Sequence, residues 1–220
     1  MSSIAHLKQN QIVVATVYGR PYFKFIKILK LLHLKYDSLL PAQIKNSESR
    51  LVLTTTKEAR KISSNLFLYD DAFDQDLTVI KGLIVEKLQL DSSENELIIG
   101  IDPGERIGLS VVYFQKEIQR SIFVSVEELI EHVVKILAGL KANKKIVKIG
   151  NGNMKTARQI VNLLNLKFCS HFELEFVDEH KTSPKIRNYN KRGKRDMLSA
   201  RYITQRDGYR HLVLPLSRTG

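Results

Sequence analysis

The chain has 220 residues, 43% of them hydrophobic and 26% charged, a composition typical of a soluble globular protein and not of a disordered one. No apolar run approaches the roughly 18 residues of a membrane span, the N-terminus lacks a secretory signal, and the single Cys169 excludes an internal disulfide, so we expect a cytoplasmic protein. Most of the net charge of +12 lies in residues 181 to 220, which indicates either a polyanionic partner or a basic solubilising tail.

The N-terminal part of the chain alternates predicted strands with predicted helices. The strands are expected at residues 11–17, near Leu39, and at 51–54 and 67–69, and the helices at 23–34 and 77–88. Thr55 with Glu58 has the spacing of a capping box, and Asp76 is the expected N-cap of the second long helix. This alternation predicts a small α/β domain with a mostly parallel sheet over residues 1–92, followed by a polar boundary at 91–96. No motif in residues 1–90 indicates a chemical function.

A second domain is predicted over residues 97–210, with residues 211–220 as a tail. The domain begins with three antiparallel strands, expected at 97–102, 107–114 and 117–124. A helix that Ser125 and Glu128 open comes next, followed by a strand at 146–149 and a helix capped by Asn153. A strand at 172–177 and a last helix at 194–206 complete the domain. A long basic loop precedes that last helix.

Asp102 stands at the end of a strand whose apolar residues indicate burial on both faces. Removing a lone carboxylate from water there costs several kcal/mol, so we expect a partner such as a metal ion. The alternative is that Asp102 only opens the Asp-Pro-Gly turn that ends with Gly104.

Three motifs follow one another in this second domain: IGIDPG with GLSV at 99–111, VDEHKTS at 177–183, and RDMLSARYI at 195–203. Together they resemble the RNase H-like superfamily, specifically RuvC-type Holliday junction resolvases and YqgF-like domains. The resemblance implies an α/β fold with a mixed five-stranded sheet and flanking helices. It also implies that the first and fourth strands are neighbours at the centre, that the last helix lies across them, and that carboxylates from distant segments converge on Mg²⁺ or Mn²⁺.

The expected ligands are Asp102, Asp196 and a third carboxylate. Helical spacing places Asp196 between Ala200 and Ile203, both expected to face the core, although Asp196 could instead serve the helix dipole or pair with a nearby arginine. The fourth strand runs into Gly150, Asn151 and Gly152, where a resolvase would carry an acid. The resemblance to YqgF-type proteins therefore implies Glu179, or failing that Asp178, as the third carboxylate. Asn151 is a further candidate ligand, or only part of a turn.

These residues predict a metal-dependent nuclease acting on structured nucleic acid, with Asp102, Glu179 and Asp196 as catalytic metal ligands. Junction cleavage would favour a homodimer, because symmetric cuts need paired sites. The missing acid on the fourth strand leaves a second hypothesis open, an inactive module that only binds nucleic acid. In either case we expect backbone contacts from cationic side chains, which are Lys181, Lys185, Arg187, Lys191, Arg192, Lys194, Arg195 and Arg201.

Overall fold

The computed structural model describes residues 11–44, 50–89, 95–167, 172–178 and 192–211, with the side chains of residues 192–195 and 211 excepted. The chain divides into two compact units, Met1–Ser93 and Glu94–Gly220. The division falls within the polar segment 91–96. None of the helices in the described ranges is long and apolar enough to cross a membrane.

The first unit is built on a four-stranded parallel sheet with the order β2-β1-β3-β4. Its strands are β1 (Ile12–Val14), β2 (Asp37–Ser38), β3 (Leu51–Thr54) and β4 (Phe67–Tyr69). Its helices are α1 (Gly19–Leu31), α2 (Thr56–Ala59) and α3 (Leu77–Leu88), with 3₁₀ turns η2 (Pro41–Gln43) and η3 (Asp70–Asp74). The predicted parallel α/β architecture of this unit is confirmed.

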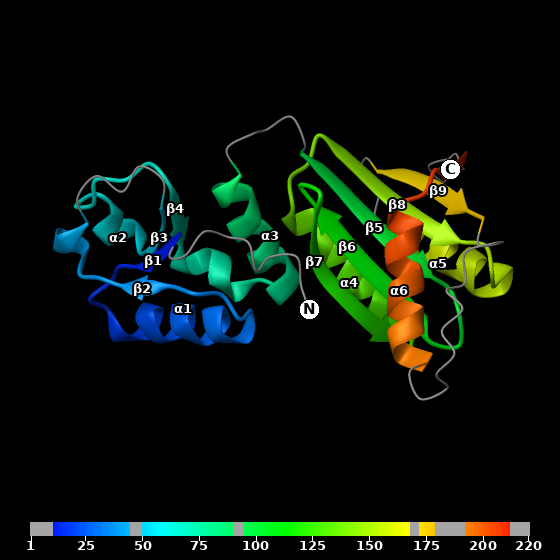
Figure 1. Ribbon diagram of the computed structural model, residues 1–220, viewed down its shortest axis with the longest axis horizontal. Coiled ribbons are helices and arrows are strands. Elements are labelled where there is room, and N and C mark those ends of the chain that lie inside the picture. The colour runs from blue at the N-terminus through cyan, green and yellow to red at the C-terminus, as the bar shows by residue number, and fades with distance from the viewer. Residues whose placement is uncertain (1–10, 45–49, 90–94, 168–171, 179–191, 212–220) are drawn as a thin grey trace, which may run out of the picture. The chain divides into compact units, whose positions relative to one another are not determined.

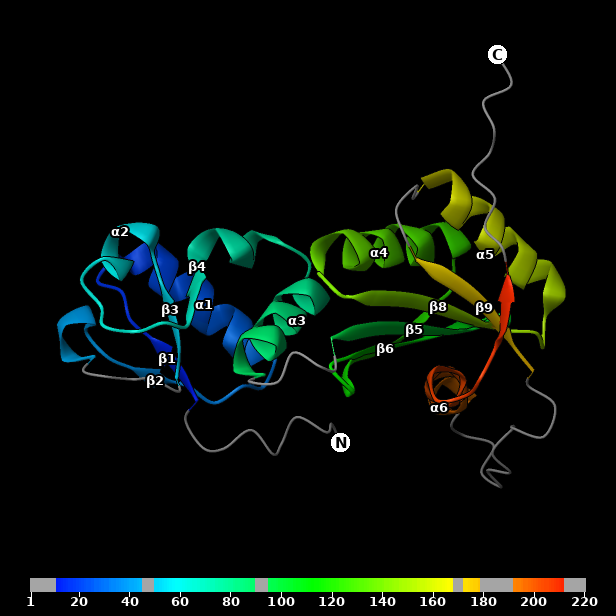
Figure 2. The ribbon, with the colours of Figure 1, turned by 90° about the horizontal axis from the view of Figure 1, so that it is seen from above.

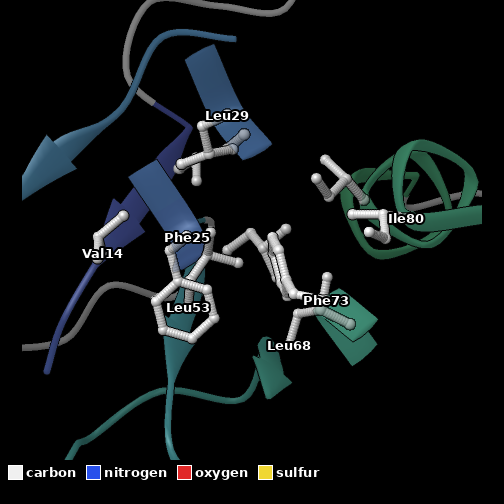
Figure 3. Packing of buried hydrophobic residues seen from close by; sticks show 10 residues of the cluster. Val14, Phe25, Leu29, Leu53, Leu68, Phe73 and Ile80 are labelled. Atoms are coloured by element: carbon white, nitrogen blue, oxygen red, sulfur yellow. The ribbon is translucent and has the colours of Figure 1, made fainter. Parts of the chain in front are cut away.

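Apolar side chains fill both faces of this sheet. On one face, Val14 and Leu53 pack with Phe25 and Leu29 of α1, with Phe73, and with Ile80 of α3 (Figure 3). On the other face a smaller cluster contains Val13, Ala15, Ile44, Val52 and Ile62. Neighbouring residues of β1 thus face opposite clusters, as the two-residue period of a strand requires.

The predicted capping residues are confirmed where the structure gives their hydrogen bonds. The side chains of Thr55, Asp76, Ser125 and Asn153 accept backbone N–H groups of Glu58, Thr78, Glu128 and Thr156. Glu58 itself is buried, and its carboxylate accepts hydrogen bonds from Thr16, Thr55 and the Val17 N–H. Burial raises the pKa of Glu58, but these hydrogen bonds outweigh that effect and leave its pKa below the usual 4.5.

The second unit contains a six-stranded mixed sheet with the order β10-β9-β8-β5-β6-β7. Its strands are β5 (Glu96–Asp102), β6 (Ile107–Tyr113), β7 (Lys116–Phe123), β8 (Lys144–Gly150), β9 (Glu173–Val177) and β10 (Tyr209–His211). The central strand β5 pairs antiparallel with β6 and parallel with β8, and β8 pairs parallel with β9. Helices α4 (Val126–Gly139) and α5 (Met154–Lys167) cover one face, and α6 (Arg192–Thr204) crosses the other (Figures 1 and 2).

The prediction of five strands was wrong because it missed β10. This strand is three residues long, and it pairs antiparallel with β9 at the sheet edge. Its sequence carries no apolar alternation, so its conformation depends on the pairing with β9 and not on local preference. Helix α1 likewise begins at Gly19, before the predicted Phe23, because Pro21 fits the first turn of a helix, where its missing N–H has no intrahelical partner.

Candidate functional site

The carboxyl ends of three parallel strands meet at one edge of the second sheet. Asp102 ends β5, while Asn151 and Asp178 directly follow β8 and β9. The register pairs Ile101 with Ile149, and Gly150 with Val177, so the three strands end side by side. Three of the predicted site residues therefore lie at the same edge of the sheet.

Helix α6 lies directly on the sheet because two glycines remove the side chains that would separate them. A Cβ on Gly100 of β5 would lie 2.4 Å from the carbonyl oxygen of Ala200. A Cβ on Gly108 of β6 would lie 2.3 Å from the carbonyl oxygen of Asp196. Both distances are far below van der Waals contact, so only glycine permits this approach of the helix backbone.

This close approach places Asp102 and the backbone of Asp196 beside the same residue, Gly108. Gly108 is the cross-strand partner of Asp102 and also lies under the Asp196 carbonyl group. Asp102 lies two residues after Gly100, so strand alternation places it on the face that α6 covers. Both aspartates are partly buried. As predicted, Ala200 and Ile203 face the core, with exposures of 0% and 3%.

A network of charges holds one flank of α6. Glu117 of β7 accepts hydrogen bonds from Arg120 at 2.9 Å and from Ser110 at 2.9 Å, and Arg201 of α6 donates to it at 3.2 Å. Burial raises the pKa of Glu117, but the Arg120 and Ser110 hydrogen bonds and the two guanidinium charges lower it below 4.5 overall. Arg201, which was predicted to contact nucleic acid, is therefore engaged by Glu117 here.

Lys148 holds the other flank. Its side chain is only 9% exposed; its ammonium group donates to the carbonyl oxygen of Arg206, just after α6, and lies 3.4 Å from the carboxylate of Glu175. Because β8 and β9 present Lys148 and Glu175 to this face, the alternation of side chains assigns Gly150 to the same face. The position of β8 nearest Asp102 on the α6 side thus carries no side chain.

Asn151 and Asp178 interact with each other. The Asn151 amide donates to the Asp178 carboxylate at 3.3 Å, and the Arg206 guanidinium donates to the Asp178 carbonyl oxygen at 3.2 Å. The structure thus joins Asn151 to Asp178 by a hydrogen bond, while Asp102 and Asp196 belong to a strand and a helix that meet at Gly108.

The remaining predicted residues are described only in part. Glu179, Lys181, Lys185, Arg187 and Lys191 lie outside the described residues, and for Arg192, Lys194 and Arg195 only the helical backbone is described. Within the described side chains no group of three or more His, Cys, Asp or Glu residues could hold a metal ion.

Sequence reasoning missed Gly100, Gly108, Glu117 and Lys148, which position α6. A signal was available for the glycines, because a glycine inside an apolar strand often marks a close backbone approach. Glu117 and Lys148 gave no such signal, since a charged residue in a strand is ordinarily solvated.

A comparison with known protein families finds no matching family, and a comparison with curated proteins finds no match.

Proposed function

We propose that the second unit is a Mg²⁺- or Mn²⁺-dependent nuclease that hydrolyses phosphodiester bonds in structured nucleic acid. The observation that carries the proposal is that the backbone of Asp196 lies against Gly108, the cross-strand partner of Asp102, although the two aspartates are far apart in the sequence. The central position of β5 beside β8, with the last helix over this sheet, supports the RNase H-like resemblance.

The donor set fits the metal. Carboxylate oxygens are the ligands that Mg²⁺ and Mn²⁺ prefer, and Asp102 and Asp196 supply them from a strand and a helix that pack directly together. When bound, the metal neutralises charge on the scissile phosphate and makes a water molecule more acidic. Glu179 remains the proposed third ligand.

The residues around the pair have positioning roles. Glu117 through Arg201, and Lys148 through the Arg206 carbonyl group, attach α6 to the sheet on both flanks. A ligand pair on two rigidly attached elements keeps its geometry when substrate binds. The cationic side chains of residues 181–195 would then hold backbone phosphates, and binding should weaken steeply with salt.

A second candidate is a binding module without activity. It is favoured by the absence of a three-residue metal group among the described side chains and by Gly150, which offers no ligand beside Asp102. Such a module would retain the phosphate contacts and lose hydrolysis.

The test is cleavage by the purified full chain. Labelled four-way junction, duplex and single-stranded substrates are incubated with Mg²⁺ or Mn²⁺, using the wild type, Asp102→Asn, Asp196→Asn and Glu179→Gln. Asp207→Asn is the matched control, because this exposed acid follows α6. We expect cleavage that needs the metal, that the first three variants abolish, and that the control retains.

Two results separate the candidates. An inert wild type that still binds these substrates supports the binding module. Cleavage by Asp102→Asn or Asp196→Asn at the wild-type rate refutes the proposed ligand pair.

A further inference from the structure

Helix α1 of the first unit exposes a basic face that no contact among the described residues explains. The helix contains Arg20, Lys24, Lys27 and Lys30 and no acidic residue. At 3.6 residues per turn, Arg20, Phe23, Lys27, Lys30 and Leu31 fall within one stripe about 100° wide. All five are exposed, and we refer to them as the α1 stripe.

The described side chains of the unit do not neutralise the charges of the stripe. Lys24, at the edge of the stripe, pairs with Asp74 at 2.8 Å and donates to the carbonyl oxygen of Asp70 at 3.0 Å. The ion pair of η3 with α1 is therefore made by Lys24. Among the described side chains, by contrast, Arg20, Lys27 and Lys30 have no ion pair. Three unpaired cations on about three turns of helix form a local positive field, although residues 1–95 carry a balance of only +3.

Exposed apolar residues lie between these cations. Phe23 is 64% exposed and Leu31 is 55% exposed, and Tyr18, at the N-terminal end of the same helix, is 48% exposed. Exposed apolar side chains that gather on one face can mark an interaction site, and an aromatic ring beside cations offers a stacking surface for nucleobases.

We propose that the α1 stripe is a nucleic-acid-binding surface, with Arg20, Lys27 and Lys30 on backbone phosphates and Phe23 against a base or sugar. This assigns the first unit a role in binding substrate and does not depend on hydrolysis by the second unit. A lipid surface fits less well, because the apolar side of α1 is used inside the unit: Phe25 and Leu29 are fully buried. The residues left to enter a bilayer are isolated between charges.

The experiment measures the binding of labelled 30-nucleotide single strands and 30-base-pair duplexes, of DNA and of RNA, by fluorescence anisotropy. The full chain is used in EDTA, so that binding is separated from any metal-dependent cleavage. One variant replaces the stripe cations, Arg20→Gln with Lys27→Gln and Lys30→Gln. The matched control removes the same charge at other exposed cations of this unit, Lys57→Gln with Arg60→Gln and Lys61→Gln. A third variant is Phe23→Ala.

We expect the stripe variant to raise Kd at least about 10-fold at 50 mM salt, and to reduce the slope of log K against log salt by about 2 to 3, because each lost phosphate contact removes about 0.7 to 0.9. The control variant should bind within about 3-fold of wild type. Phe23→Ala should weaken single-strand binding at least about 5-fold, since one stacked base contributes about 1–3 kcal/mol.

Three results would overturn the proposal. The first is an unchanged Kd and salt slope for the stripe variant, and the second is a loss of affinity in the control variant as large as that in the stripe variant. The third is competition by poly-glutamate as strong as that by unlabelled nucleic acid, which would indicate an unspecific polyanion site. Stronger retention of the wild type on phosphatidylserine vesicles than on nucleic acid would assign the stripe to membranes and refute it also. The proposed catalysis is refuted by a different result. If the α1 stripe binds nucleic acid but the chain cleaves nothing in Mg²⁺ or Mn²⁺, only the proposed catalysis is refuted.

Discussion

Replacing Gly108 by alanine should displace α6 and separate Asp102 from Asp196. The added Cβ would lie 2.3 Å from the Asp196 carbonyl oxygen and 2.8 Å from its carbonyl carbon. A Cβ atom essentially never lies closer than 3.0 Å to a heavy atom of this kind of neighbour, so the helix backbone must move by at least about 0.7 Å. Neither side can relax by rotating a side chain, since a helix carbonyl group faces a central strand. We therefore expect the free energy of unfolding to fall by about 1–3 kcal/mol.

The same displacement acts on the proposed site. A misplacement of about 1 Å in a catalytic group can cost about 100-fold in rate, so Gly108→Ala should lose cleavage far beyond its loss of stability. Urea unfolding followed by circular dichroism measures the first effect, and junction cleavage under fully folded conditions measures the second. Gly19→Ala is the matched control, because a Cβ there meets no atom within 4 Å. A Gly108→Ala protein as stable as the wild type would refute the close packing of α6.

Two further substitutions test the charges that hold α6. Glu117→Gln should lower the free energy of unfolding by about 1–3 kcal/mol at pH 7, because its removal leaves Arg120 and Arg201 without their carboxylate. Since folding lowers the pKa of Glu117 below 4.5, its contribution is complete above that pH and is lost as the pH falls through the folded pKa. Urea titrations at pH 7 and at about pH 3 should show the difference from wild type shrinking, and a constant difference would contradict the assigned pKa direction. Lys148→Met should cost about 1–3 kcal/mol, because Glu175 and the Arg206 carbonyl group lose a buried partner. Lys144→Met, whose side chain is 43% exposed and lies 3.6 Å from Glu173, should cost less than about 1 kcal/mol in the same assay, and equal losses would contradict the importance of burial.

Local signals in the sequence were sufficient for most elements of both units. The strand at Leu51–Thr54 and the helix at Leu77–Leu88 have the predicted bounds, since an apolar run defines the strand and the N-cap Asp76 begins the helix. The expected start of α4 is also confirmed, because Ser125 is its N-cap. These features depend on interactions within a few residues, and such interactions can be read from spacing alone.

The position of α6 on the sheet depends on contacts across long sequence separations. Gly108 and Asp196 touch only because the last helix returns over the first hairpin, and Arg201 meets Glu117 across 84 residues. Helical periodicity predicted correctly that Ala200 and Ile203 face the core, but it did not indicate which strands lie beneath them. The short strand β10 was missed for the same reason, as its pairing with β9 determines its conformation.

The structure also narrows the source of a third ligand. The register that pairs Ile101 with Ile149 brings Asp102 beside Gly150, and the side chains that follow on β8 and β9, Asn151 and Asp178, bond to each other. Strand β8 itself contains no carboxylate, and the carboxylate that follows β9 accepts a hydrogen bond from Asn151. The difference between a nuclease and a binding module then depends on the segment after Asp178, where Glu179 is the proposed ligand. For this reason Glu179→Gln is a more decisive variant than any change at Asn151, whose amide already has Asp178 as its partner.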